Sequence, residues 1–315
     1  LLGEALPSRH QRISVGVQTF DEERLRLMGR QGFGGRDDIA KVIEVAHAQG
    51  MTASVDLLIN LPGQSAEEVL ADIRQADDLG VDQICIYHLV LYEGLGTEWS
   101  EDEELLAALP SNAAAFETWR RARDELLSRG FEQRTLTNFE RAGVARSARA
   151  FTYEAASFHA DQVDAVGFGP GGISTFTSPR LESGVKLVNG AGADDYRAAV
   201  ARDGRAWALR FDYDDEADRR LLFITRSLAL LGVSRPAYRW LFGGDIDRHF
   251  GRELQALLKE KLVRVDSARL ELTEKGMFYA DSVAGLFASR RSWSLSLHDK
   301  TIGDPDEETL ASHMG

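Results

Sequence analysis

Two polar side chains stand on apolar, strand-like segments, at places where a ligand could be bound. Gln18 closes the apolar run 12–17, and Asp56 lies within the run 53–59. Buried strands rarely hold either residue type without a partner. An amide both donates and accepts hydrogen bonds, and a carboxylate is a compact acceptor. We predict that both bind a polar ligand. The structural alternatives are a strand-capping amide for Gln18 and a salt bridge for Asp56.

Three further candidates lie near these segments. Arg30 carries a permanent charge that can fork onto a carboxylate, with a solvated helix charge as the alternative. Tyr87 and His88 come near the end of the next strand-like run, 83–91. His88 could donate a proton to a substrate or contact it, and a hydrogen-bonded structural histidine is an equally good interpretation.

A glycine cluster contains Gly167, Gly169 and Gly171. It is not a dinucleotide fingerprint, because the β-type run 173–177 follows it where that motif would open a helix. Glycines at a strand end permit a ligand to approach the backbone closely. A structural turn is the alternative.

The elements that must position these residues form repeated β/α units. Such repeats indicate an α/β fold with a parallel sheet, whose strands carry the chemistry at their carboxyl ends. The visible repeats correspond to half of a TIM-like (β/α)6 barrel. Ser65 and Glu68 form a capping box that predicts a helix start. The apolar patterning predicts strands at 12–17, 53–59, 83–91, 131–139 and 163–167, and helices at about 38–50, 65–80 and 111–129.

The pattern changes at about residue 214. Amphipathic helices at 215–231 and 246–262 precede two short alternating runs, which is typical of a small winged-helix-like α+β domain. We therefore predict a barrel part with its extension at 1–213, a C-terminal domain at 214–297 and an acidic tail at 298–315.

Composition excludes several classes of function. A net charge of −13 argues against nucleic acid or an anionic membrane as the main partner, despite the winged-helix-like layout. There is no apolar stretch approaching 18 residues, so we expect a cytoplasmic protein. The single cysteine, Cys85, lies in an apolar run and reads as a core residue. We predict no metal ligands in this chain.

Several motifs together resemble one family, over residues 10 to 287. The chain resembles the radical S-adenosylmethionine (SAM) enzymes grouped around oxygen-independent coproporphyrinogen III oxidase, the HemN-like family. Each motif is weak alone, but their shared order is specific. The motifs are Arg12 to Phe20, Val55 to Gln64, Tyr87-His88-Leu89, Gly130 to Phe139, Val166 to Ser174 and Leu272 to Gly276.

The resemblance implies roles for these residues. Gln18, Arg30 and Asp56 match positions that contact SAM in the family. The segment around Tyr87 lies where a second SAM is expected. The loop with Gly167, Gly169 and Gly171 would lie beside SAM and substrate, and the C-terminal domain would cover the barrel mouth.

The family's [4Fe-4S] cluster is the main departure. Its Cys-x-x-x-Cys-x-x-Cys motif does not occur here, and one thiolate cannot hold such a cluster. We expect the cluster to be held by a segment that is not in this chain, upstream of a first strand that resembles the family's fourth. A naturally cluster-less relative is the alternative.

A second departure concerns the substrate. Thr135 replaces the acidic residue of a Tyr-Glu pair in porphyrinogen-binding relatives, and the segment from Arg146 to Phe151 lacks their His-Asn. The resemblance therefore favours the class C methyltransferase and cyclopropanase branch. Such an enzyme uses two SAM molecules to transfer a one-carbon unit to an sp² carbon of a secondary metabolite. A small-molecule substrate and a one-electron reductant such as flavodoxin or ferredoxin are implied. The alternatives are a coproporphyrinogen III dehydrogenase and a haem chaperone.

Overall fold

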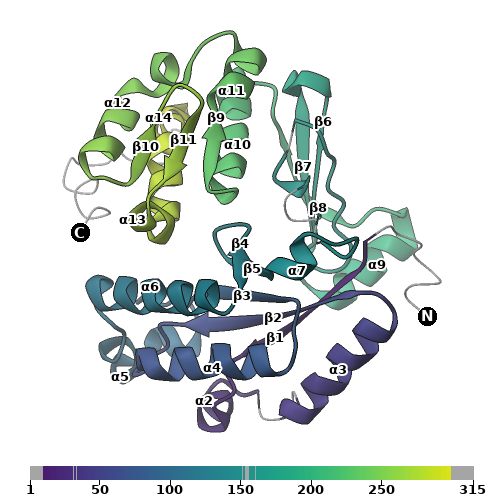
Figure 1. Ribbon diagram of the computed structural model, residues 1–315. Helices are drawn as coiled ribbons and strands as arrows, with labels where there is room; N and C mark the ends of the chain where they lie inside the picture. The colour runs from purple at the N-terminus through teal and green to yellow at the C-terminus, as the bar shows by residue number, and fades with distance from the viewer. Residues whose placement is uncertain are drawn as a thin grey trace. The chain divides into compact units, whose positions relative to one another are not determined.

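A computed structural model of the chain describes residues 10–30, 32, 34–150, 152, 156–159 and 161–298. Contacts within the chain divide it into two compact units, 1–156 and 157–315, which are described separately (Figure 1). Across the described ranges, no helix has both the length and the apolar character needed to cross a bilayer. The sequence-based boundary at 213/214 falls between a strand and a helix of the second unit and stays a prediction.

The first unit is built on a mixed five-stranded sheet of order β1-β2-β3-β5-β4. β1, β2 and β3 are parallel, as predicted, and β5 and β4 run antiparallel to their neighbours. The closed or half-closed barrel stays a prediction. The strands are β1 (Arg12–Gln18), β2 (Thr52–Ile59), β3 (Gln83–His88), β4 (Phe131–Gln133) and β5 (Asn138–Arg141).

The prediction of one strand over 131–139 is wrong. The segment folds into a hairpin, in which the backbone N–H of Arg134 donates to the carbonyl of Asn138 at 2.9 Å. The Thr135 hydroxyl accepts from the backbone N–H of Asn138 at 3.1 Å. A threonine that bonds the backbone in this way favours a turn over a continuous strand.

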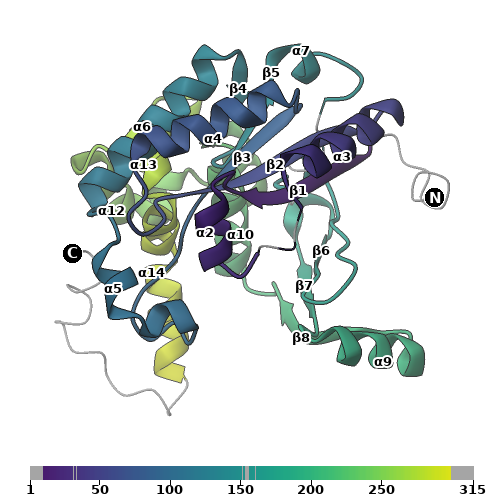
Figure 2. The ribbon, with the colours of Figure 1, turned by 90° about the horizontal axis from the view of Figure 1, so that it is seen from below.

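Three long helices cover one side of this sheet, as Figure 2 shows. The predicted capping box is confirmed at α4, where Ser65 N–H donates to Glu68 and Glu68 N–H donates to the Ser65 hydroxyl. Ser111 caps α6 with a single hydrogen bond, its hydroxyl accepting from the backbone N–H of Ala114. The helices of the unit are α2 (Glu22–Leu27), α3 (Arg36–Ala48), α4 (Ala66–Asp78), η1 (Glu98–Glu101), α5 (Glu103–Ala107), α6 (Asn112–Ser128) and α7 (Ala142–Ala145).

The two faces of the sheet differ in chemistry, because successive side chains of a strand point to opposite faces. The face under the helices is apolar and includes Val17, Val55 and Ile84, which are all buried. The other face carries polar side chains from every parallel strand, such as Ser14, Asp56 and Gln83. A parallel sheet is usually apolar on both faces, so this second face has a purpose other than core formation.

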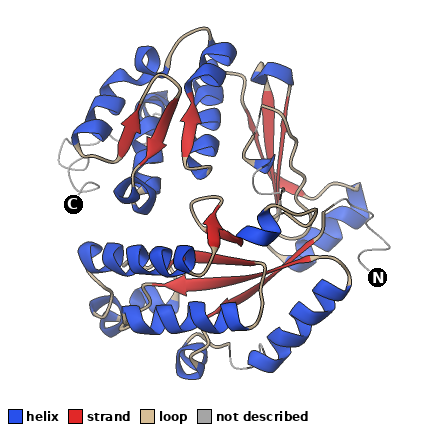
Figure 3. Ribbon diagram, in the orientation of Figure 1, coloured by secondary structure: helices blue, strands red, loops and turns tan. Residues whose placement is uncertain are grey.

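The second unit contains two antiparallel three-stranded sheets (Figure 3). The predicted strand at 163–167 is reduced to one bridge, between Ala165 and Thr175. The winged-helix-like assignment stays a prediction, and residues 299–315 of the predicted tail lie outside the described residues. The elements are β6 (Ile173–Thr177), η2 (Pro179–Leu181), β7 (Gly184–Asn189), α9 (Ala193–Asp203), β8 (Trp207–Asp212), α10 (Glu216–Ala229), β9 (Gly232–Ser234), α11 (Arg235–Phe242), α12 (Ile246–Lys259), β10 (Val263–Val265), β11 (Arg269–Leu272), α13 (Glu274–Phe278) and α14 (Ala280–His298).

Candidate functional site

The carboxyl end of β1 gathers an amide, a guanidinium and a glycine. Arg30 donates from Nη2 to the carbonyl of Gly16 at 2.8 Å. A Cβ atom on Gly16 would lie 2.8 Å from Nε2 of Gln18 and 3.7 Å from Nη2 of Arg30. The Gln18 side chain therefore lies over Gly16, in space that only a glycine leaves open.

The backbone at this strand end is irregular. The register with β2 shifts between Val15 and Gln18, and Gln18 has φ of 69°. Positive φ is uncommon for a residue with a side chain, and bulges next to functional sites re-aim side chains. The same feature recurs after β2, where Asn60 has φ of 63°. Strained backbone at two neighbouring strand ends motivates a functional hypothesis for this edge.

Asp56 lies on the neighbouring strand and is held by Ser14. The hydroxyl of Ser14 donates to Oδ1 of Asp56 at 2.9 Å. Ser14 is exposed and Asp56 is half-buried. The sequence reasoning identified Asp56 but missed Ser14 and Gly16. Their signal was available, because the spacing of Ser14, Gly16 and Gln18 along one strand follows the period of two.

A layer of helix residues supports this edge. Buried Asp72 of α4 accepts from the backbone N–H of Phe20 at 2.9 Å, and burial raises the pKa of the Asp72 carboxyl. Arg24 of α2 donates to the carbonyls of Pro62 at 2.8 Å and Gly63 at 3.0 Å. These contacts fix the chain on leaving β1 and β2, and sequence reasoning found neither.

Tyr87 and His88 point to opposite faces of the sheet. Tyr87 pairs with Leu58 in the register that pairs Asp56 with Cys85, so it shares the polar face of Asp56 and is 39% exposed. His88 belongs to the helix side, where its Nδ1 lies 3.0 Å from Nδ2 of Asn60. The geometry therefore favours the structural interpretation of His88, and its catalytic role stays a prediction.

The glycine loop of the second unit is bonded within itself. Asn189 donates from Nδ2 to the carbonyls of Gly167 at 3.2 Å and Gly169 at 2.9 Å. The N–H of Gly169 donates to the hydroxyl of Tyr196, and that of Gly171 to the carbonyl of Gly190. Gly169 and Gly171 have positive φ. These contacts explain the glycines as a turn, and their role beside a ligand stays a prediction.

Comparison with protein-family models finds no match. The chain is 24% identical over 279 residues to "Heme chaperone HemW" of Bacillus subtilis, covering 88% of this chain and 69% of that protein. It is 24% identical over 310 residues to "Oxygen-independent coproporphyrinogen III oxidase" of Bradyrhizobium diazoefficiens, covering 92% and 64%. The solved structure of coproporphyrinogen III oxidase (HemN) from Escherichia coli matches with a TM-score of 0.65 at 20% identity, covering 88% of this chain and 64% of that chain.

The chain is therefore similar in sequence to HemW and coproporphyrinogen III oxidase proteins. Its α/β fold matches that of HemN. It spans about two thirds of the length of these relatives, which leaves the activity of the whole protein to proposal.

The described residues of this chain do not fit an iron–sulfur cluster. Its one cysteine, Cys85, is 1% exposed and its sulfur accepts from Asn138 Nδ2 at 3.2 Å. Among the described residues, no group of three His, Cys, Asp or Glu side chains could hold a metal ion. One buried thiol therefore cannot hold a [4Fe-4S] cluster.

Thr135 and Arg146, at which the sequence departs from the porphyrinogen-type motifs, both have structural contacts. Thr135 is 2% exposed and closes the β4–β5 turn. Arg146 is largely exposed and pairs with Glu132. Phe151 lies outside the described residues. No carboxylate stands at 135, so a contact from an acidic side chain at that position is lost.

Proposed function

We propose that the carboxyl edge of β1 and β2 binds SAM. The observation that carries the proposal is the grouping of Gln18 and Arg30 at Gly16, with the Ser14–Asp56 pair on the adjoining strand. Arg30 suits the carboxylate of the methionine part, because a guanidinium forks onto carboxylates. Gln18 can serve an ammonium or a carboxylate, and Asp56 can accept from an ammonium or from ribose hydroxyls. Bound SAM would supply a sulfonium with activated carbon–sulfur bonds.

For the reaction, we propose one-carbon transfer with two SAM molecules to an sp² carbon of a small-molecule substrate. Support comes from Gln18, Arg30 and Asp56, which match the SAM-contacting positions of the resembled family, together with Thr135, which stands where the resemblance leads us to expect an acidic residue in porphyrinogen-binding proteins. Such chemistry also requires a [4Fe-4S] cluster on cysteines that this chain does not contain, and a one-electron reductant such as flavodoxin or ferredoxin.

SAM binding is tested by isothermal titration of the 315-residue chain with SAM. Gln18→Ala and Asp56→Ala should each weaken binding by about 1–3 kcal/mol, the range for removing one partner of a polar contact. Gln49→Ala and Asp78→Ala are matched controls at exposed helix ends of the same unit and should bind as wild type. Equal affinity in the Gln18 and Asp56 variants would show that both residues are only structural.

The reaction class is tested in the native gene product, assayed anaerobically with deuteromethyl-SAM and a reductant. Label transferred to an unsaturated carbon of the product supports the proposal. Release of carbon dioxide from coproporphyrinogen III, with no label transferred, would replace it with oxidative decarboxylation.

Haem binding is a second candidate, favoured by the similarity to HemW proteins over 88% of the chain. It predicts a Soret shift on haem titration with a Kd of about 1 μM or tighter. Our first proposal predicts no saturable shift in that range. The two titrations therefore separate a haem carrier from a SAM-dependent transferase.

A further inference from the structure

A cleft in the second unit combines cationic and aromatic walls. It lies between α10, α12 and α14 and has a volume of about 230 Å³. Three guanidinium groups line it and, among the described residues that form its walls, there is no carboxylate. The main wall residues are Arg220, Arg290, Arg291, His249, Phe250 and Phe287.

The guanidinium groups are held by carboxylates that lie outside the walls. Arg291 donates from Nε and Nη2 to both oxygens of Asp218, at 2.7 and 2.8 Å. Arg290 pairs with Glu253 at 2.6 Å. Arg220 pairs with Glu216, one helical turn earlier. Arg291 also lies 3.2 Å from Asp215. These carboxylates orient the cations and offset their charge, so we expect weak binding of an anion, through hydrogen bonds from the guanidinium groups rather than through net charge.

One donor in the wall has no partner. Nε of Arg220 is buried without a hydrogen bond to any described residue. A buried donor without a partner is unfavourable. Nε is covered in this structure, so an acceptor that enters the cleft would meet it only after the partly exposed Arg220 side chain shifts. His249 is already engaged through its Nδ1, which lies 3.0 Å from the hydroxyl of Tyr238. Burial, together with Arg220 and Arg248, lowers the pKa of His249, which keeps its ring neutral at pH 7.

The remaining wall is apolar. Phe250 and Phe287 meet edge to face, with ring centroids 5.4 Å apart. Phe250 departs from helical geometry within α12, with φ of −133° and ψ of 31°. An apolar ligand body can pack on such rings while a charged end meets the guanidinium groups.

We propose that this cleft binds a small aromatic carboxylate, with its carboxylate at Arg220 and Arg290 and its ring on Phe250 and Phe287. The volume is below the range of about 300–1,000 Å³ that is typical for drug-sized ligands, so the ligand is small or enters with one end only. The proposal concerns the second unit alone and does not depend on SAM binding by the first.

Benzoate is the probe, titrated into the 315-residue chain and followed by isothermal titration and by amide chemical shifts. Benzyl alcohol and acetate test the charged end and the ring separately. Benzoate should bind at least about fivefold more tightly than either, with shifts centred on α10, α12 and α14. Equal binding of benzyl alcohol, or equal binding of acetate, would overturn the proposal.

Three variants test whether benzoate binds in this cleft. Arg220→Gln should weaken benzoate binding about tenfold or more, as expected for loss of a charged hydrogen bond. Arg252→Gln removes an exposed cation of α12 outside the cleft and should leave binding unchanged. Ala217→Leu fills the wall without removing an ion pair and should abolish binding, which keeps the test decisive if Arg220→Gln lowers the Tm. Unchanged affinity in Arg220→Gln or in Ala217→Leu would overturn the proposal.

Discussion

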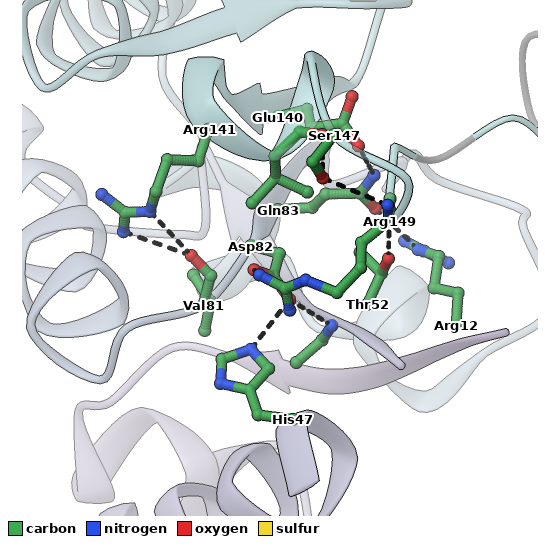
Figure 4. A network of polar contacts seen from close by, with 12 residues as sticks. Arg12, His47, Thr52, Val81, Asp82, Gln83, Glu140, Arg141, Ser147 and Arg149 are labelled. Carbon is green, nitrogen blue, oxygen red and sulfur yellow. Dashed lines mark hydrogen bonds and ion pairs between the residues drawn. The ribbon is translucent and has the colours of Figure 1, made fainter. Parts of the chain in front are cut away.

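In the first unit, charged side chains at the amino ends of the parallel strands have different surroundings from those at the carboxyl ends. At the amino ends of β2 and β3, Asp82 is 3% exposed and accepts from Ala53 N–H at 2.9 Å, from Arg149 Nη1 at 3.2 Å, and lies 2.8 Å from His47 Nε2 (Figure 4). At the carboxyl ends, Asp56 is half-buried and is held by the exposed Ser14.

We call the amino ends of β2 and β3, around Asp82, the saturated edge. Its hydrogen bonds continue along the polar face of the sheet. Arg12 donates to Gln83 at 2.8 Å, and Gln83 donates to Glu140 at 2.9 Å (Figure 4). Arg12 also donates to Ser54 at 2.8 Å. Buried charges that are fully bonded in this way specify strand pairing and leave little capacity for a ligand. The carboxyl edge has strained backbone and more accessible polar groups, which is the arrangement that a ligand can complete.

We expect the largest effect on stability from removing the Asp82 carboxylate at the saturated edge. Asp82→Ala should destabilise the chain by about 1–3 kcal/mol, because it leaves the buried Ala53 N–H without its acceptor, while the partly exposed Arg149 can be solvated. Urea unfolding measures this loss. Any folded fraction should keep the SAM affinity of wild type. A loss below about 1 kcal/mol would mean that solvent replaces the carboxylate and that this edge is not saturated.

A smaller change tests the space at the open edge. Gly16→Ala places a methyl group 2.8 Å from the Gln18 amide, so the side chain must move. We expect SAM binding to weaken by about 1 kcal/mol while unfolding changes little, since Gly16 does not have positive φ. Titration and urea unfolding of the same variant separate the two effects. Full SAM affinity in Gly16→Ala would show that the position of Gln18 is unimportant.

The Ser14–Asp56 hydrogen bond should have a weaker influence. Ser14→Ala should lower SAM affinity by about 0.5–1.5 kcal/mol, the usual net value of one hydrogen bond, and Ser14→Thr should restore it. Rescue by threonine distinguishes a held carboxylate from general strand packing. If alanine and threonine behave alike, Ser14 does not position Asp56.

The smallest effect concerns the stability of the fold in acid and involves Glu68, at the start of α4. Burial opposes ionisation of Glu68, but hydrogen bonds from Ser65 and Arg24 outweigh it and lower its pKa from 4.5 to about 2. Its contribution is therefore present above pH 4.5 and is lost as the pH falls towards about 2. Because Glu68 is 40% exposed, we expect less than about 1 kcal/mol. Thermal unfolding of wild type and Glu68→Gln should differ above pH 4.5 and converge in acid. A difference that persists at pH 2 would contradict this assignment.

The sequence by itself determined the features that depend on near neighbours. The apolar, strand-type runs 12–17 and 53–59 predicted β1 and β2, and the Ser65–Glu68 pair predicted the start of α4, because such runs and caps involve residues a few positions apart. The same patterns placed Gln18 and Asp56 on neighbouring parallel strands.

Only the tertiary structure decided which polar groups meet. Ser14 and Asp56 are 42 positions apart, and Arg12 and Gln83 are 71 apart. The face taken by His88 depended on where β3 ends and on its register with β2. Register is a sum of many pairings along a strand, and one residue of shift reverses every side chain. For this reason the sequence could indicate which polar residues matter, but not which of them meet. The register decided that the polar groups at the amino ends of the strands bond to one another, and that those at the carboxyl ends form the candidate site.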